Sequence, residues 1–273
     1  MSDDHTASTS ALTESEAADR LTRVHGANEL HATVLALLLP KGSKRALRAW
    51  QIETTGTPGA ELLREHAVTL SGAARLPWLE QLVARMAAQP LAARQSLLQA
   101  TRRIMGARGV ARPIDRLHWL AMRRGLGEVA PLAARPEANV EVAEWLESDV
   151  LTIAVYSAFL SRMVPGSEVD SEEGRAWYDA VMSTWQPFAE VPARQPPNAE
   201  AMVDALSRMQ TLSWMQRPVI VRTWVATALS ESHGLRLADL SADALRLSCS
   251  LLDSPLPPEL SRHYIALPGE AAR

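Results

Sequence analysis

Residues 90–109 read PLAARQSLLQATRRIMGARG, and the pattern of this stretch recurs along much of the chain. It opens on Pro90, which suits the first turn of a helix because the N–H groups there have no helical partner to lose. Leucine, isoleucine and methionine then follow at helical spacing, so that they share one face. Gly106 and Gly109 close the stretch, as glycine often does after a helix. The pattern predicts an amphipathic helix that ends within residues 106–109.

The same spacing predicts helices along the rest of the chain, several of them opened by a proline or closed by a glycine. Alternating apolar runs bounded by Asn-Gly or Asp-Gly turns, which indicate β-hairpins, are nearly absent. The sequence therefore predicts an all-α fold. Besides the first stretch, the expected helices cover residues 17–39, 46–52, 58–70, 76–88, 113–126, 140–163, 172–185, 201–212, 218–232 and 241–252.

Changes in composition along the chain predict its division into segments. The expected segments are a disordered tail over residues 1–19, an N-terminal helical module over 20–130, connecting helices over 131–185, a proline-rich linker over 186–199, a C-terminal helical module over 200–265 and a tail over 266–273. The helix expected over 140–163 is the longest of the connector.

An internal repeat supports two similar modules. Residues 76–126 and 206–252 both read as a helix, a proline-started helix, a glycine turn and a further helix. The match has no fixed residue register, so it is architectural. The alternative is that any two stretches of a helical protein look alike.

Composition and charge exclude several classes of protein. The chain has 273 residues, of which 47% are hydrophobic and 22% charged, as expected of a folded globular protein. A net charge of -3 argues against a surface wrapped in nucleic acid, and a single cysteine, Cys249, excludes a disulfide framework. The first nineteen residues lack the apolar core of a secretory signal. The apolar runs 30–39 and 150–164 are shorter than the roughly 20 residues of a membrane span. We expect a cytoplasmic protein.

The eight tryptophans fall mostly at apolar helical positions. Each ring buries a large area, so the expected role is in the core. One or two of them are expected in a groove between the two halves. They are Trp50, Trp78, Trp119, Trp145, Trp177, Trp185, Trp214 and Trp224.

Sequence motifs for catalysis are absent. No histidine is followed by glutamate, so the His-Glu-x-x-His pattern of zinc peptidases does not occur. Neither a Gly-x-Ser-x-Gly elbow nor a phosphate-binding loop is present. Cys249 is expected as a small buried hydrophobe, His118 as a half-buried histidine, and Glu65 and His66 as neighbours that point apart on one helix. We expect no catalytic residue, no metal and no cofactor.

Arginine is concentrated between residues 94 and 124, where Asp115 is the only acidic residue. Such a patch suits acidic proteins, anionic lipid surfaces or nucleic acid. Alternatively, it is solvated or balanced internally, since five acidic residues follow between 137 and 149. Only Trp119 offers a stacking surface within the patch, which disfavours single-stranded nucleic acid. The predicted partner-binding residues are Arg102, Arg103, Arg108, Arg112, Arg116, Arg123 and Arg124.

Three segments resemble a known helical region. Residues 32–39 (ATVLALLL) are similar to the run that opens it. Residues 75–80 (RLPWLE), 91–109 and Asp115 resemble its first half, and residues 203–258, which include Pro-Leu-Pro-Pro, resemble its second. The family is the soluble C-terminal region of bacterial HtpX-like membrane zinc metallopeptidases, which is related to the TerB fold. The resemblance spans about residues 24–258.

The resemblance implies two TerB-like modules joined by a long-helix connector, standing without a peptidase domain. It also implies turns in which Asp-Gly precedes an acidic residue, whereas this chain has Arg108-Gly109 and His233-Gly234. Asp115, Asp239 and Asp243 remain near the expected acids, but a hard cation needs more oxygen ligands than these turns offer.

The expected function is that of a non-catalytic interaction or scaffold protein. The expected partner is an acidic protein or a cytoplasmic membrane protein such as a metallopeptidase, and nucleic acid is disfavoured. The alternative is an enzyme or small-ligand binder with an interhelical pocket. A convergent acid, base and amide in a deep pocket favour that alternative, and a shallow basic or apolar groove favours docking.

Overall fold

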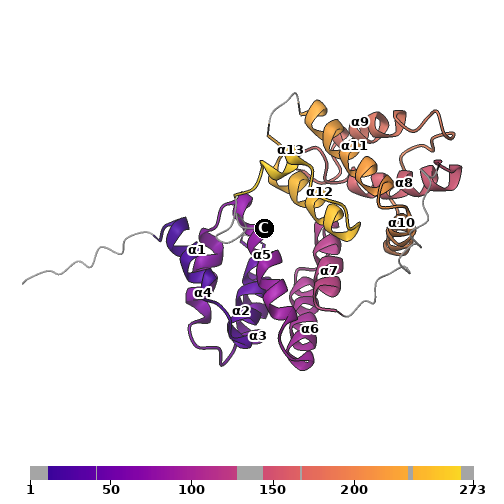
Figure 1. Cartoon of the computed structure of the whole chain (residues 1–273). Helices are drawn as coiled ribbons and strands as arrows, with labels where there is room; N and C mark the ends of the chain where they lie inside the picture. The colour runs from indigo at the N-terminus through magenta and orange to yellow at the C-terminus, as the bar shows by residue number, and fades with distance from the viewer. Residues whose placement is uncertain (1–11, 41, 128–143, 167, 233–235, 266–273) are drawn as a thin grey trace, which may run out of the picture.

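The computed structural model describes residues 12–40, 42–127, 144–166, 168–232 and 236–265 (Figure 1). Within these ranges the chain forms helices and no strand, which confirms the predicted all-α fold. The first seven helices are α1 (Glu14–Thr22), α2 (Ala27–Leu37), α3 (Lys44–Glu53), α4 (Ala60–Thr69), α5 (Gly72–Ala87), α6 (Leu91–Ala107) and α7 (Pro113–Gly125). They are followed by α8 (Glu147–Leu160), α9 (Glu172–Ser183), α10 (Ala199–Thr211), α11 (Gln216–Glu231), α12 (Asp239–Leu251) and α13 (Pro258–Ser261).

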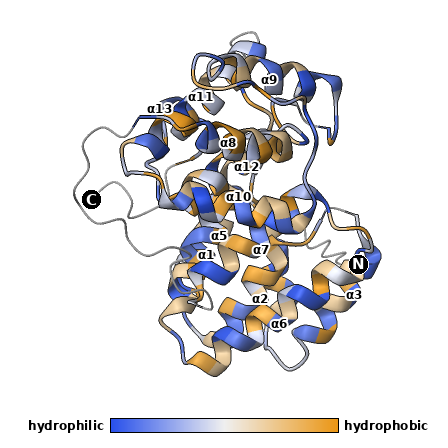
Figure 2. Cartoon of the chain, turned by 90° about the vertical axis from the view of Figure 1, so that its right-hand side faces the viewer, coloured by the Kyte–Doolittle hydropathy of each residue, from blue (hydrophilic) through white to orange (hydrophobic). Residues whose placement is uncertain are grey.

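Helix α2 is the centre of the N-terminal half. Every residue from Thr33 to Leu37 is buried, because α3, α4, α5 and α6 all pack around this helix. Figure 2 shows apolar residues along α2, α5 and α7, and α5 packs on both of the other two. Most of the apolar run 30–39 thus lies in a core helix, as its length predicted. No helix among the described residues is long and apolar enough to cross a membrane.

Helix α8 takes the corresponding place in the C-terminal half, where it packs on α10 and α9. It is shorter than the helix predicted over 140–163. Residues 144–146 are not helical, and residues 140–143 lie outside the described ranges. Asp149 caps the start of α8 by accepting a hydrogen bond from the Leu146 N–H at 3.1 Å, and the helix ends at Leu160.

The predicted proline-rich linker contains no helix between its first residue and Pro197, but it is bound to the C-terminal half. The Tyr178 hydroxyl donates to the Pro192 carbonyl at 2.8 Å. Arg194 Nε donates to Ser161 Oγ at 2.6 Å. Helices α8 and α9 also pack on α10 and α11. The expected connecting helices therefore contact the expected C-terminal module directly.

Helix α12 joins the two halves by packing on α7 and α5 (Figure 1). Arg246 of α12 contributes an ion pair to Glu80 of α5 at 2.6 Å. Pro77 lies inside α5, whereas the sequence predicted a helix start at residue 76. Its missing N–H leaves the Ala73 carbonyl without an intrahelical donor. The Ile265 N–H takes that place at 3.3 Å, so the proline creates a contact for the C-terminal segment.

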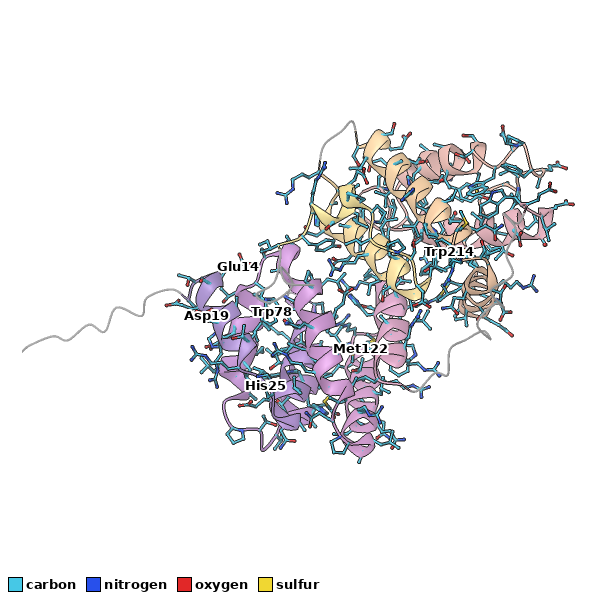
Figure 3. All side chains as sticks on the ribbon, in the orientation of Figure 1. Glu14, Asp19, His25, Trp78, Met122 and Trp214 are labelled. Carbon is cyan, nitrogen blue, oxygen red and sulfur yellow. The ribbon has the colours of Figure 1, made fainter. Side chains whose placement is uncertain are left out.

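Most of the tryptophans lie in the core, as expected. Trp50, Trp78, Trp177, Trp185 and Trp224 are almost fully buried. Trp214 is the exception, with 68% of its surface exposed. Figure 3 labels Trp78 among the N-terminal helices and Trp214 in the C-terminal half.

Helix α9 approaches α8 closely because Gly174 has no side chain. A Cβ at this position would lie 1.9 Å from the carbonyl oxygen of Ser161. We expect Gly174→Ala to destabilise the protein by about 1–3 kcal/mol, because the two backbones must separate. The control is Gly106→Ala in α6, where a Cβ meets nothing within 4 Å and where we expect stabilisation by about 0.5–1 kcal/mol. Urea unfolding measures both, and equal effects would contradict the packing.

Candidate docking groove

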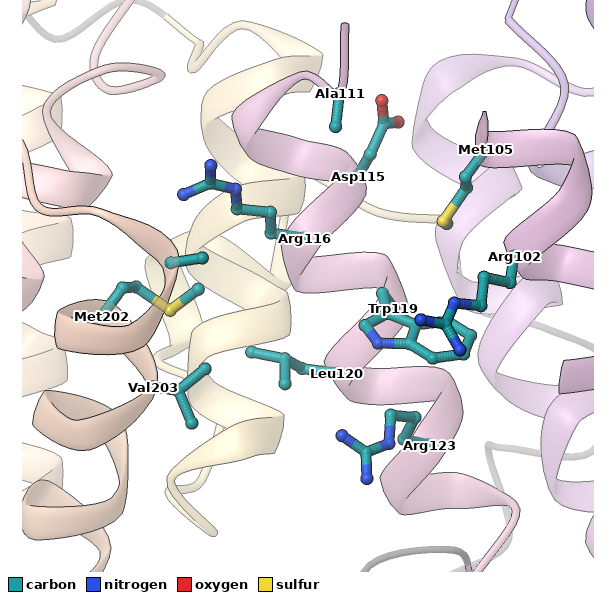
Figure 4. Close-up of a pocket in the computed structure, with 11 residues that line it drawn as sticks. Arg102, Met105, Ala111, Asp115, Arg116, Trp119, Leu120, Arg123, Met202 and Val203 are labelled. Carbon is teal, nitrogen blue, oxygen red and sulfur yellow. The ribbon is translucent and has the colours of Figure 1, made fainter. Parts of the chain in front are cut away.

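A groove of about 360 Å³ lies where α6, α7 and α10 meet (Figure 4). Helix α7 runs along its middle, with α6 on one side and α10 on the other. Its apolar lining comes from all three helices and comprises Met105, Trp119, Leu120, Met202 and Val203. Three arginines, Arg102, Arg116 and Arg123, and one acidic residue, Asp115, also line it. The groove therefore combines an apolar surface with positive charge.

The spacing of residues along α7 explains why they share this groove. Arg116, Trp119, Leu120 and Arg123 stand at positions i, i+3, i+4 and i+7, which lie on one face of a helix. Another face of α7 packs on α12. The groove-lining face is left partly open because α6 and α10 flank it without covering it.

Two of the three arginines lack a described partner. Arg102 is exposed and forms no hydrogen bond or ion pair with any residue that the structure describes. Arg116 is half-buried, and its Nη1 is buried without a hydrogen bond. Arg123 stands over Trp119, with its guanidinium carbon 6.0 Å from the ring centroid, within cation–π range.

The other four predicted arginines bind within the protein. Arg103 pairs with Glu53 of α3 through two bonds, Nε to Oε1 at 2.5 Å and Nη2 to Oε2 at 2.7 Å. Arg124 donates to the Leu251 carbonyl at 2.6 Å and also contacts Asp253, which ties α7 to the end of α12. Both residues therefore have internal roles.

Asp115 gathers two more of the predicted arginines. It pairs with Arg108 at 2.6 Å and with Arg112 at 3.0 Å. Burial by itself raises the pKa of Asp115, but the hydrogen bond from Arg112 and the charges of Arg108 and Arg112 outweigh burial and lower this pKa. Arg108 also donates to the Leu38 carbonyl, so it links α6 to the end of α2.

The patch predicted from the sequence is thus divided by the structure. Arg102, Arg116 and Arg123 come together at the groove, while Arg103, Arg108, Arg112 and Arg124 lie in internal ion pairs. The sequence had suggested acids between 137 and 149 as internal partners. Glu137 and Glu141 lie outside the described residues, and Asp149 caps α8 instead.

The sequence placed Trp119 in the arginine patch and predicted one or two unspecified tryptophans in a groove, but it did not indicate Met202 and Val203. These two residues belong to α10, more than seventy positions from α7 along the chain. Their only sequence signal was an apolar face on an expected helix, which does not tell which neighbour it meets. The helical spacing of Arg116, Trp119, Leu120 and Arg123 could have predicted that these four residues share one face.

The cysteine and the Glu-His pair considered in the sequence do not form a reactive site. Cys249 is buried, and burial raises the pKa of its thiol to about 12, which suppresses the nucleophilic thiolate. His66 is buried, while Glu65 is exposed, so the two point apart as expected. Among the described residues, no three His, Cys, Asp or Glu side chains are placed to hold a metal.

The lining of the groove indicates which kind of ligand it can hold. An apolar floor beside arginines with unused donors can hold a ligand that is both apolar and acidic. No protein-family model, curated protein or solved structure matches the sequence or the fold.

Proposed function

We propose that this protein is a non-catalytic docking protein, whose groove between α6, α7 and α10 binds an amphipathic, acidic helix of a partner protein. The observation that carries the proposal is the apolar floor of Trp119, Leu120 and Val203 beside Arg102 and Arg116. Amphipathic helices commonly bind by laying their apolar face into such a groove. The arginines then select partners with carboxylates next to that face.

The state of Arg116 supports an acidic partner. A buried donor without a hydrogen bond is unfavourable, and a partner's carboxylate would supply the missing bond when the Arg116 side chain turns toward the groove. An exposed ion pair contributes under about 1 kcal/mol. The apolar floor therefore supplies most of the affinity, and the arginines supply orientation and selectivity.

The resemblance noted in the sequence narrows the proposed partner. An accessory region of membrane metallopeptidases would act by binding such a membrane protein from the cytoplasmic side. We therefore propose a cytoplasmic location and a partner that is an acidic protein or a cytoplasmic membrane protein such as a metallopeptidase. The two-module, TerB-like interpretation of the fold belongs to the same proposal.

The test uses a synthetic helical peptide with leucines at i, i+3, i+4 and i+7 flanked by glutamates, and a second peptide with lysine at each glutamate position. We expect the acidic peptide to bind the native protein and the basic peptide to bind weakly or not at all. Binding of the acidic peptide should weaken as salt rises, because exposed charges are screened. Fluorescence anisotropy of labelled peptides measures both.

Two variants place the binding site. Arg102→Glu with Arg116→Glu should abolish the preference for the acidic peptide. The matched control is Arg45→Glu with Arg48→Glu on α3, which makes the same change in charge at exposed positions outside the groove. Val203→Glu in the floor of the groove should also prevent binding and leaves both arginines in place. If both groove variants fold and bind the acidic peptide as the native protein does, the groove is not the docking site.

A further inference from the structure

A second cavity, of about 280 Å³, lies among the end of α2, α5, α7 and α12. Leucines of α2 and α5 make up the apolar part of its lining, among them Leu76 and Leu79. Arg75, His118 and Asp243 come from α5, α7 and α12 and also line it. Three polar side chains from three helices therefore face one space, which Arg112 and Asp239 also line.

The Arg75 guanidinium is a fixed cation in this cavity. Its Nε donates to the Leu37 carbonyl at 2.8 Å, and its Nη2 donates to the carbonyls of Ala36 and Leu39 at 3.1 and 3.0 Å. These bonds cap the end of α2 and hold the side chain in place. Its Nη1 forms no hydrogen bond, and the guanidinium forms no ion pair, with any residue that the structure describes. The Nη1 donors are therefore available to a ligand.

His118 and Asp243 also offer polar atoms without partners among the described residues. Neither ring nitrogen of His118 forms a hydrogen bond there, and burial lowers the pKa of His118 to about 4, so that the ring is neutral at pH 7. Asp243 Oδ1 accepts from the Tyr264 hydroxyl at 3.1 Å, while its Oδ2 has no such partner. A neutral imidazole offers one donor and one acceptor, and a protonated carboxyl offers one donor.

Two further charged side chains, Arg112 and Asp239, line the cavity, and Asp239 is largely exposed to solvent. Arg112 pairs with Asp115 at 3.0 Å, and Asp239 lies 3.2 Å from His263. The Arg75 guanidinium forms no ion pair with a described residue, and Asp243 offsets its charge only when that carboxyl is ionised. The Arg75 charge would repel a cationic ligand, whereas an anionic ligand would form an ion pair with it. The leucines favour an anion that carries an apolar chain over an inorganic one.

We propose that this cavity binds a small aliphatic carboxylate, with its charged end on Arg75 Nη1 and its chain against the leucines. The Asp243 carboxyl, in its protonated form, and the His118 ring donate further hydrogen bonds to the ligand carboxylate. The volume is below the roughly 300–1,000 Å³ of drug-sized pockets, so the ligand is a short-chain acid. This site is separate from the docking groove and does not depend on the docking function.

The protonation of Asp243 gives the binding a pH dependence. Burial raises the pKa of Asp243 to about 7, the Tyr264 hydrogen bond opposes this rise, Asp239 and Glu80 add to it, and Arg246 opposes it. Arg75 and His118 face the same space from α5 and α7. Only the protonated carboxyl donates to a ligand carboxylate. The apparent Kd should therefore rise about tenfold between pH 6 and pH 8, as the competent fraction falls.

Calorimetric titration of the full chain with straight-chain carboxylates from acetate to octanoate tests the proposal. We expect binding that strengthens with chain length until the cavity is full and then declines. The corresponding amides should bind at least about tenfold more weakly, because they lack the charge that Arg75 completes. Inorganic phosphate should not bind. If no carboxylate binds the folded protein at pH 6, or if phosphate binds as well as the best carboxylate, the proposal is wrong.

Variants of the cavity residues test whether binding occurs at this site or follows from the overall charge of the protein. Asp243→Asn keeps a donor but cannot ionise, so the affinity should no longer change between pH 6 and pH 8. His118→Leu and Arg75→Gln should weaken binding. Leu79→Trp, which fills the cavity and leaves the Arg75 cap in place, should prevent binding if Arg75→Gln does not fold. Arg102→Glu in the groove should have no effect. A pH dependence that persists in Asp243→Asn would rule out this role of Asp243.

Discussion

Replacing Trp224 with alanine is expected to lower the free energy of unfolding by about 3–5 kcal/mol, the range for deleting a large buried aromatic side chain. Trp224 is fully buried in α11 and stacks on Tyr156 of α8, with ring centroids 5.5 Å apart. Its Nε1 donates to Ser157 Oγ at 2.9 Å. The substitution therefore leaves a cavity between two helices and removes the partner of a buried hydroxyl.

Trp214→Ala is the matched control, because it deletes the same side chain at an exposed position. We expect a change within about 0.5 kcal/mol there. Urea denaturation followed by circular dichroism measures both variants. Similar losses in the two variants would contradict the placement of Trp224 in the core.

Asp243→Asn is expected to stabilise the unliganded protein at pH 8 and to change how stability depends on pH. The pKa of Asp243 is raised from an ordinary 3.8 to about 7 in the folded state, mainly by burial. Between these values the folded protein holds a proton that the unfolded chain has lost, so the free energy of unfolding falls as pH rises. Asparagine has no charge to bury and avoids this loss.

The stability of Asp243→Asn relative to the native protein should therefore grow from about pH 4 and level off above about pH 7. One proton contributes at most about 1.4 kcal/mol for each pH unit. Across this window we expect a gain on the order of 3–4 kcal/mol. Denaturant titrations at several pH values measure it. A difference that stays constant from pH 4 to pH 8 would show that Asp243 titrates normally.

His118 provides the opposite control. Burial lowers its pKa from 6.5 to about 4. Between these values the unfolded chain binds the extra proton, so this residue makes the protein more stable as pH rises. His118→Gln should therefore gain stability relative to the native protein as pH falls from about 6.5 toward 4. The two residues act in opposite directions over most of the same pH range.

The helices could be predicted because their signals are local. The helix expected from residues 90–109 is α6, Leu91–Ala107, and the one expected over 241–252 is α12, Asp239–Leu251. Apolar spacing, prolines and glycines within each segment carried this information. The helix expected over 76–88 is α5, which begins four residues earlier, at Gly72, and contains Pro77. Within this helix, the C-terminal segment bonds to the Ala73 carbonyl.

The start of α8 also differs from the start predicted for the helix over 140–163. The apolar and acidic residues from 140 onward fit a helix, but the Asp149 side chain caps the backbone at Leu146. A local side-chain bond therefore fixes the boundary. Helical spacing predicts which residues share a face of the helix, but it does not predict the residue at which the helix begins.

The sequence by itself determined the helical class, the buried nature of the apolar runs and the concentration of arginine between residues 94 and 124. Each of these depends on residues close together in the chain. Only the tertiary structure decided what the arginines do, because their partners are distant. Glu53 lies 50 residues from Arg103, and Asp253 lies 129 residues from Arg124. The groove and the Arg75 cavity likewise exist only where separate helices meet, and helix packing rather than local spacing sets which side chains face one another.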